Sequence, residues 1–202
     1  MSESLKNKML EKIEKENMKA FCTSDFIELG SYDGIRKVFE RLAKEDKIRN
    51  VFPGVYYKTE YNEFFKMYAA PPIVECAFAL ARKFNWNIAP GGNYCLNLLG
   101  LSTQVPAKYI FISDGPCRIY NIEKLIIEFR HSNKKEISNY SYITNVVIQS
   151  LKALGKQNIS KEICEKIAKK IPEESKQILL TEARKTNLWI YQFIKVICAK
   201  GE

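Results

Sequence analysis

Residues 21–58 have the sequence FCTSDFIELGSYDGIRKVFERLAKEDKIRNVFPGVYYK, and this stretch decides the fold. Thr23 or Ser24 is a good N-cap for a brief helix, and Gly30 can adopt the left-handed conformation that ends it. Ser31 is the next N-cap. The helix that follows has an apolar stripe at helical spacing, formed by Ile35, Val38, Phe39 and Leu42. The stretch therefore predicts a short helix, a glycine turn and a second helix.

The segments before and after these two helices complete an order of helices and strands that is known from other proteins. Leu5, Met9 and Ile13 recur at helical spacing among charged residues, which predicts an amphipathic first helix. After the second helix, residues 48–51 and 55–58 are strand-like and flank a Phe-Pro-Gly turn. A helix, a short helix, a tight turn, a helix and a hairpin follow one another in a winged helix-turn-helix. We expect this domain over residues 1–60.

Residues 61–202 alternate helical and strand-like segments. Two prolines at 71–72 begin a predicted helix, because proline is tolerated in a first helical turn. Strand-like segments at 108–113, 117–121 and 124–130 suggest an antiparallel meander, and the pattern is helical from Ser138 onward. The predicted fold class is α+β, with a C-terminal domain over residues 61–202 that contains a small antiparallel sheet and several helices.

In a winged helix-turn-helix the second helix of the motif enters the major groove of DNA. The predicted partner is therefore double-stranded DNA. Arginine suits bidentate contacts to guanine, whereas lysine and serine suit phosphate. The residues expected to contact DNA are Ser31, Tyr32, Asp33, Arg36, Lys37, Arg41, Lys44, Arg49 and Asn50.

A plainer interpretation of the same helix stays open. Arg36 with Glu40, and Arg41 with Glu45, have the i, i+4 spacing of ion pairs on a solvated face. Winged helices also serve as protein-interaction modules. On this interpretation the charged side of the helix has no nucleic-acid role.

The net charge of +9 suggests a polyanionic partner, but its distribution weakens that inference. Residues 1–60 hold 12 basic and 11 acidic side chains, whereas residues 61–202 hold 20 and 12. Between Lys124 and Lys170 there are 10 basic and 4 acidic residues. We hypothesise extra phosphate contacts at Lys134, Lys135, Lys169 and Lys170. A merely solvated surface is the alternative.

A second candidate site lies in the C-terminal domain and comprises Gly91, Gly92, Gln104, Asp114 and Arg118. Two glycines ahead of a short helix can present backbone N–H groups to phosphate. The segment lacks a Walker lysine and a full dinucleotide fingerprint, so a tight connection is the more ordinary interpretation.

Enzyme chemistry gains little support from the sequence. His131 is the only histidine, and Asp114, Glu123 and Glu128 form no recognisable acid–base pair. No two of the six cysteines are separated by only two or three residues, as zinc and redox motifs require. We expect no catalytic residues, no metal and no cofactor.

Targeting and membrane signals are also missing. The first residues carry no apolar h-region of a signal peptide, and the apolar stretch 188–199 is short and interrupted by Gln192 and Lys195. We expect a cytoplasmic protein that does not enter membranes.

Several longer strings resemble one known family. Residues 38–44 (VFERLAK), with Phe26, Gly30 and Ser31 before them and residues 54–56 (GVY) after them, resemble the N-terminal domain of AbiEi-type antitoxins. Residues 90–93 (PGGN), 97–106 (NLLGLSTQVP) and 113–118 (SDGPCR) resemble the second domain of a short branch of that family. Relatives tend to have Pro-Ser-Gly where this chain has Pro90-Gly91-Gly92, so any role of that serine is absent here.

The resemblance implies a function that the spacing of residues does not. It implies a transcriptional autorepressor and antitoxin of an AbiE-like toxin–antitoxin system for abortive infection and phage defence. The functional partner would be a nucleotidyltransferase-like toxin, opposed without a stable complex. Two alternatives remain: a protein-interaction module that neutralises a toxin directly, and a nucleotide-handling enzyme that uses the glycine-rich loop.

Overall fold

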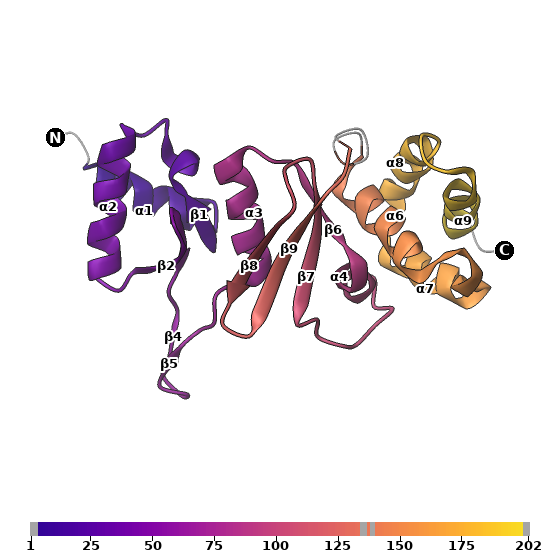
Figure 1. The fold of residues 1–202 in the computed structure, drawn as a ribbon, viewed down its shortest axis with the longest axis horizontal. Coiled ribbons are helices and arrows are strands. Elements are labelled where there is room, and N and C mark those ends of the chain that lie inside the picture. Colours follow the sequence, from indigo (N-terminus) through magenta and orange to yellow (C-terminus); the bar gives the residue numbers. More distant parts are fainter. Residues whose placement is uncertain (1–3, 134–136, 138–139, 200–202) are drawn as a thin grey trace. The chain divides into compact units, whose positions relative to one another are not determined.

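The computed structural model describes residues 4–133, 137 and 140–199, and it confirms the α+β fold class. The chain forms two compact units, Met1–Trp86 and Asn87–Glu202. The division falls later than the expected boundary near residue 60, because the helix that follows residue 72 packs within the first unit. Most helices and strands of each unit are labelled in Figure 1.

The first unit is built on a three-stranded antiparallel sheet with the strand order β1-β3-β2. The first helix, the helix after Ser31 and the hairpin strands lie close to their expected positions, and residues 20–22 add a strand to the predicted hairpin. The brief helix expected before Gly30 is wrong, because the structure has only a 3-10 turn there and Gly30 does not adopt the left-handed conformation. The elements in chain order are α1 (Leu5–Lys15), β1 (Ala20–Cys22), the 3-10 turn η1 (Thr23–Phe26), α2 (Tyr32–Lys44), β2 (Ile48–Phe52) and β3 (Val55–Lys58).

The core of the first unit lies between these helices and the sheet. Phe21, Phe26 and Phe39 are fully buried, and their ring centroids are 5.5 to 5.8 Å apart. Met9 and Ile13 of α1 join the same cluster, together with the apolar stripe of α2. The stripe that predicted the helix is therefore the side of α2 that faces the core.

Two further elements of the first unit follow β3. A small hairpin is formed by β4 (Tyr61–Asn62) and β5 (Met67–Tyr68), and the helix α3 covers Ile73–Phe84. The Arg82 guanidinium at the end of α3 donates to Asp25 at 2.6 and 3.0 Å and to the Ala20 carbonyl at 3.1 Å. These bonds tie α3 to η1 and β1.

The second unit begins with a four-stranded sheet in the order β6-β7-β9-β8. The expected meander needs correction, because β7 pairs in parallel with β9, and β8 lies outside β9 at the edge. Ile127 and Phe129 of β9 are fully buried, whereas Arg118, Ile119 and Asn121 of β8 are exposed, so the apolar strand takes the central position. The elements are β6 (Ile88–Gly91), α4 (Gly92–Leu98), β7 (Lys108–Ser113), β8 (Arg118–Ile122) and β9 (Leu125–His131).

A helical layer completes the second unit, and α6 is its central helix, with every residue from Thr144 to Leu151 buried. Gly155, at a φ of 78°, ends α6 as the sequence predicts, and Ser160 caps the next helix by accepting from Ile163 N–H. No helix within the described residues is long and apolar enough to cross a membrane. The helices are α6 (Tyr142–Leu154), the 3-10 turn η2 (Lys156–Asn158), α7 (Lys161–Lys170), α8 (Glu173–Ala183) and α9 (Leu188–Cys198).

Candidate nucleic-acid interface

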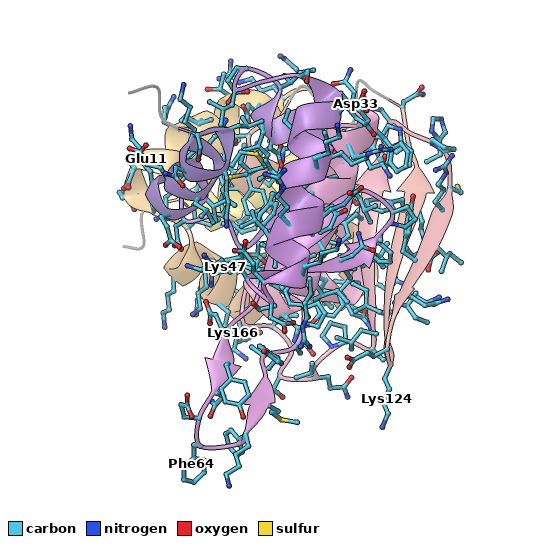
Figure 2. All side chains as sticks on the ribbon, turned by 90° about the vertical axis from the view of Figure 1, so that its left-hand side faces the viewer. Glu11, Asp33, Lys47, Phe64, Lys124 and Lys166 are labelled. Atoms are coloured by element: carbon cyan, nitrogen blue, oxygen red, sulfur yellow. The ribbon has the colours of Figure 1, made fainter. Side chains whose placement is uncertain are left out.

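Helix α2 presents one side to solvent because its start and its inner side are held firmly. The Ser31 hydroxyl accepts a hydrogen bond from Gly34 N–H at 3.3 Å, which caps the first turn. A side chain at Gly34 would meet Leu5 of α1 at 3.3 Å, so glycine allows the two helices to approach closely. Figure 2 looks onto α2 from this side, with Asp33 labelled at its N-terminal end. The outer face of α2 comprises Tyr32, Asp33, Arg36, Lys37, Glu40, Arg41 and Lys44, all exposed.

The charges on this outer face are only partly paired. Arg36 lies 3.7 Å from Glu40, and both side chains are 57% exposed, so the pair contributes little to stability. The other expected pair does not form, because Glu45 binds Lys6 at 2.5 Å. The Lys6 ammonium accordingly holds the pKa of Glu45 below its usual value. Arg41 is thereby left without that carboxylate.

Lys37, Arg41 and Lys44 have no ion pair within 4.0 Å among the residues that the structure describes. An unpaired exposed cation keeps its full hydration and is available to an incoming phosphate or base. The outer face of α2 therefore has three cationic side chains that no neighbouring carboxylate neutralises.

Tyr56 of β3 lies beside α2 on the hairpin. Its ring centroid is 4.7 Å from that of Phe39. Desolvation raises the pKa of Tyr56, and the nearby Glu40 carboxylate raises it further. The phenol therefore stays protonated at neutral pH and can donate a hydrogen bond.

The two expected hairpin contacts, Arg49 and Asn50, have partners within the protein. Asn50 donates to the carbonyls of Phe52 and Val55 at 2.8 and 3.2 Å, so its amide supports the turn between β2 and β3. The Arg49 guanidinium lies 3.7 Å from the ring centroid of Tyr68 and 3.8 Å from Asp46. These contacts hold Arg49 against the neighbouring hairpin.

The second candidate site is not brought together by the fold. Gly91 pairs with Ile110 near the start of β7, whereas Asp114 follows the end of that strand, about 13 Å further along at the rise of a β-strand. A side chain at Gly92 would come within 2.9 Å of Ile110, which supports the tight-connection interpretation of the glycines.

The polar residues of that second site, and Asn97 beside it, also have internal roles. Asp114 accepts from the backbone and side chain of Asn87 at 2.8 and 2.7 Å. Asn97 donates to the carbonyls of Ser102 and Gln104 at 3.1 and 2.6 Å, and so holds the loop before β7. Arg118 lies on the exposed edge strand, where it donates to the Tyr120 hydroxyl at 3.5 Å.

The structure describes two of the four hypothesised phosphate contacts of the second unit. Lys134 and Lys135 lie outside the described residues. Lys169 and Lys170 are exposed in the last turn of α7, where positive charge favours the helix dipole. Their position therefore has a structural reason besides any contact with phosphate.

The histidine and the cysteines have structural surroundings. The Nδ1 atom of His131 is 2.9 Å from the Gly115 carbonyl, and its backbone N–H donates to the Cys117 sulfur at 3.3 Å. Burial raises the pKa of the Cys76 and Cys95 thiols to about 12, which keeps them protonated and unreactive. Within the described residues, no group of three His, Cys, Asp or Glu could hold a metal ion.

Sequence reasoning missed the β4–β5 hairpin, which carries the most exposed aromatic side chains of the first unit. A signal was present, since Asn62 is a frequent turn former and is flanked by Tyr61 and Tyr68 on the two strands. The hairpin is therefore an exposed surface of the first unit in addition to the outer face of α2.

These features define an α+β protein whose first unit exposes a cationic helix face beside a β-hairpin. The chain belongs to DUF6088, a family of unknown function, whose model matches residues 7–179. No curated protein matches the chain. The chain is similar to the crystal structure of the RV2827C protein from Mycobacterium tuberculosis, with a TM-score of 0.43 and 8% sequence identity over 98% of this chain and 77% of that one.

Proposed function

We propose that the first unit is a winged helix-turn-helix that binds double-stranded DNA, with α2 as the recognition helix. The observation that carries the proposal is the outer face of α2, where Lys37, Arg41 and Lys44 have no carboxylate partner within the described residues. The opposite side of the same helix is buried in the core, so the cations project from a rigid support. Side chains on such a helix can reach base edges and phosphates in a major groove.

The nearly balanced charge of this unit sets the expected strength of binding. Each phosphate that a cation neutralises adds about 0.9 to the salt slope of DNA affinity. A contact set of three lysines and arginines therefore gives a modest slope for one copy. Sequence preference must then come from base contacts, for which the arginines of α2 are suited.

We further propose that DNA binding serves autorepression and an antitoxin role in an AbiE-like system. This finer assignment is supported by the sequence strings at residues 38–44 and 97–106. The nucleotide-handling alternative is less well supported, because Gly91 and Gly92 pack against Ile110 and Asp114 binds Asn87. Direct neutralisation would instead require a stable complex between this protein and the toxin.

The DNA-binding proposal is tested with a labelled duplex from upstream of the gene itself and an unrelated duplex of equal length. We expect tighter binding to the upstream duplex, measured by fluorescence anisotropy. Lys37→Ala with Arg41→Ala should weaken that binding by at least tenfold. The matched control, Arg184→Ala with Lys185→Ala just after α8, removes one arginine and one lysine from exposed positions outside the basic segment 124–170. Equal affinity of the α2 variant and the control would contradict the proposal.

The antitoxin role needs a separate experiment in cells. A nucleotidyltransferase-like gene next to this one would be expressed with and without the protein, and growth would be recorded. We expect rescue of growth without co-purification of the two proteins. Stable co-purification would favour direct neutralisation, and the absence of any rescue would contradict the antitoxin role.

A further inference from the structure

The outer face of α2 holds two acidic side chains among its cations. Asp33 lies in the first turn of the helix, where the helix dipole favours a negative charge. Glu40 lies further along the helix, beyond the reach of that dipole, and its side chain is 57% exposed. A carboxylate at this place would repel the phosphates that the neighbouring cations attract. Glu40 therefore needs a partner on the DNA other than phosphate.

The cation nearest to Glu40 is Arg36, one helical turn before it. The Nε atom of Arg36 is 3.7 Å from Oε1 of Glu40, and both side chains are 57% exposed. Charge-assisted hydrogen bonds are shorter than this, and an exposed pair of this kind contributes little to stability. Either side chain can therefore leave the other for a new partner at small cost.

The hairpin beside α2 leaves the Glu40 carboxylate without a second cation. Tyr56 of β3 packs against Phe39, with ring centroids 4.7 Å apart, and its phenol is neutral. The Asn50 amide is bonded to carbonyls of the β2–β3 turn. Among the residues that the structure describes, only Arg36 forms an ion pair with Glu40 within 4.0 Å. Arg36 and Glu40 thus form one exposed neutral pair on a cationic face.

The bases differ in what they offer a carboxylate in the major groove. A carboxylate only accepts hydrogen bonds. Guanine and thymine present acceptors there but no amino group, and adenine presents the acceptor N7 beside its amino group. Cytosine presents its amino group without an acceptor of its own beside it. Cytosine is therefore the base that suits Glu40 best.

We propose that Glu40 and Arg36 together read one G·C base pair. Glu40 accepts from the amino group of cytosine, and Arg36 donates to O6 and N7 of the paired guanine. The inference rests on the proposed binding of DNA through α2, and it adds the base pair that α2 prefers at this place. The loose ion pair is exchanged for two base contacts, so neither charge is left unpaired when water is displaced.

The two parts of the outer face then have different roles. Lys37, Arg41 and Lys44 follow one another at i, i+4 and i+7, so they form one cationic stripe along the helix. This stripe supplies the charge that attracts DNA. The Arg36–Glu40 pair has no net charge, so it contributes preference for a sequence and not general affinity.

The first experiment uses the upstream duplex and a panel in which each C·G pair is replaced in turn by A·T, with adenine in place of cytosine. We expect the parent to lose about fivefold or more in affinity at the pair that Glu40 contacts, measured by anisotropy. Glu40→Ala should bind the original duplex more weakly and lose nothing further at that pair. The matched control is Glu11→Ala, an exposed carboxylate on α1 that is labelled in Figure 2. It should keep every loss that the parent shows.

The second experiment tests whether the two side chains read the same pair. Arg36→Ala should remove the loss at the position that Glu40→Ala identifies. Glu40→Gln should regain affinity for the duplex with adenine there, because glutamine donates to N7 and accepts from the amino group of adenine. A role in folding alone would not produce this gain. Effects of Arg36→Ala and Glu40→Ala at two separate pairs would overturn the reading of one pair.

The salt dependence gives an independent measurement. Arg36→Ala with Glu40→Ala removes no net charge and, on this inference, no phosphate contact. The double variant should therefore keep the salt slope of the parent while it loses discrimination at the identified pair. A slope that falls by about 0.9 would place Arg36 on a phosphate and overturn its contact with guanine.

Failure of this inference differs from failure of the proposed function. If the parent binds the upstream and unrelated duplexes equally, sequence-specific binding through α2 is wrong, and the reading of a base pair is wrong with it. If the parent prefers the upstream duplex but Glu40→Ala keeps every loss on the panel, DNA binding stands and the contact with cytosine is overturned. Tighter binding of Glu40→Ala to both duplexes would also overturn it, because the carboxylate would then only repel phosphate.

Discussion

Helices α2 and α6 have the same length, 13 residues, but opposite surroundings. Helix α2 buries four residues along one side and exposes a charged face, whereas α6 buries every residue from Thr144 to Leu151. Some polar groups of α6 bond within the unit; the Asn145 amide nitrogen, for example, donates to the carbonyls of Ile137 and Tyr140. The comparison teaches that polar residues on a helix suggest binding only where the helix leaves them exposed.

The largest expected effect is a loss of folding stability caused by a substitution in the buried helix α6. Leu151 of α6 is fully buried, and Leu151→Ala should lower the free energy of unfolding by about 2–5 kcal/mol. Urea unfolding monitored by circular dichroism measures the change. Lys156→Ala, at an exposed position just after α6, serves as control and should change stability by less than about 0.5 kcal/mol. Similar losses of stability for both variants would contradict the contrast between the buried and the exposed position.

A smaller effect is expected on the exposed face of α2. Arg41→Lys keeps the charge but loses bidentate geometry, so affinity for the upstream duplex should fall by about 1–3 kcal/mol. Affinity for unrelated DNA should hardly change, because phosphate contacts accept either cation. Anisotropy titrations on both duplexes measure the difference. An equal loss on both duplexes would reassign Arg41 to phosphate.

Two substitutions of Ser31, at the start of α2, separate its capping role from a role in DNA contact. Ser31→Ala removes the acceptor for Gly34 N–H and should cost about 1 kcal/mol of stability. Ser31→Asp keeps an acceptor and retains stability, but its charge should repel phosphate and weaken DNA binding. Unfolding and anisotropy are measured on both variants. If Ser31→Asp binds DNA as tightly as the parent, the start of α2 lies away from the phosphates.

The smallest expected effect is a pH-dependent change in stability, caused by the contact of Glu182 with the start of α6. Burial tends to raise the pKa of Glu182, but hydrogen bonds from Thr144 and Ser141 outweigh it, so the pKa lies below its usual 4.5. Ionised Glu182 therefore stabilises the fold above the unfolded-state pKa, and this contribution is lost as the pH falls through the lower folded-state pKa. Glu182→Gln should lower stability near neutral pH and converge with the parent in acid.

Urea unfolding at a series of pH values measures that convergence. The matched control is Glu174→Gln, an exposed carboxylate on the same helix, α8. It should show no pH-dependent difference of comparable size. A constant difference between Glu182→Gln and the parent across the series would mean that the carboxylate charge has no part in holding α6.

Local elements of the candidate site were predictable from the sequence. Ser31 as the cap of α2 and the apolar stripe on its inner side are both confirmed, because capping and helical periodicity depend on residues within a few positions. The outer-face residues followed directly from that periodicity. The roles of Arg49 and Asn50 did not, since their partners Tyr68 and Val55 come from other segments.

The sequence by itself determined the main helices of the first unit and the β2–β3 hairpin, and that one side of α2 would face solvent. Only the tertiary structure decided that β9 lies between β7 and β8, that Arg82 binds Asp25, and that Phe64 is exposed. The physical reason is the separation along the sequence over which each kind of interaction acts. Capping and periodicity act between near neighbours, whereas strand order, ion pairing and burial depend on which distant segments compete for the same space.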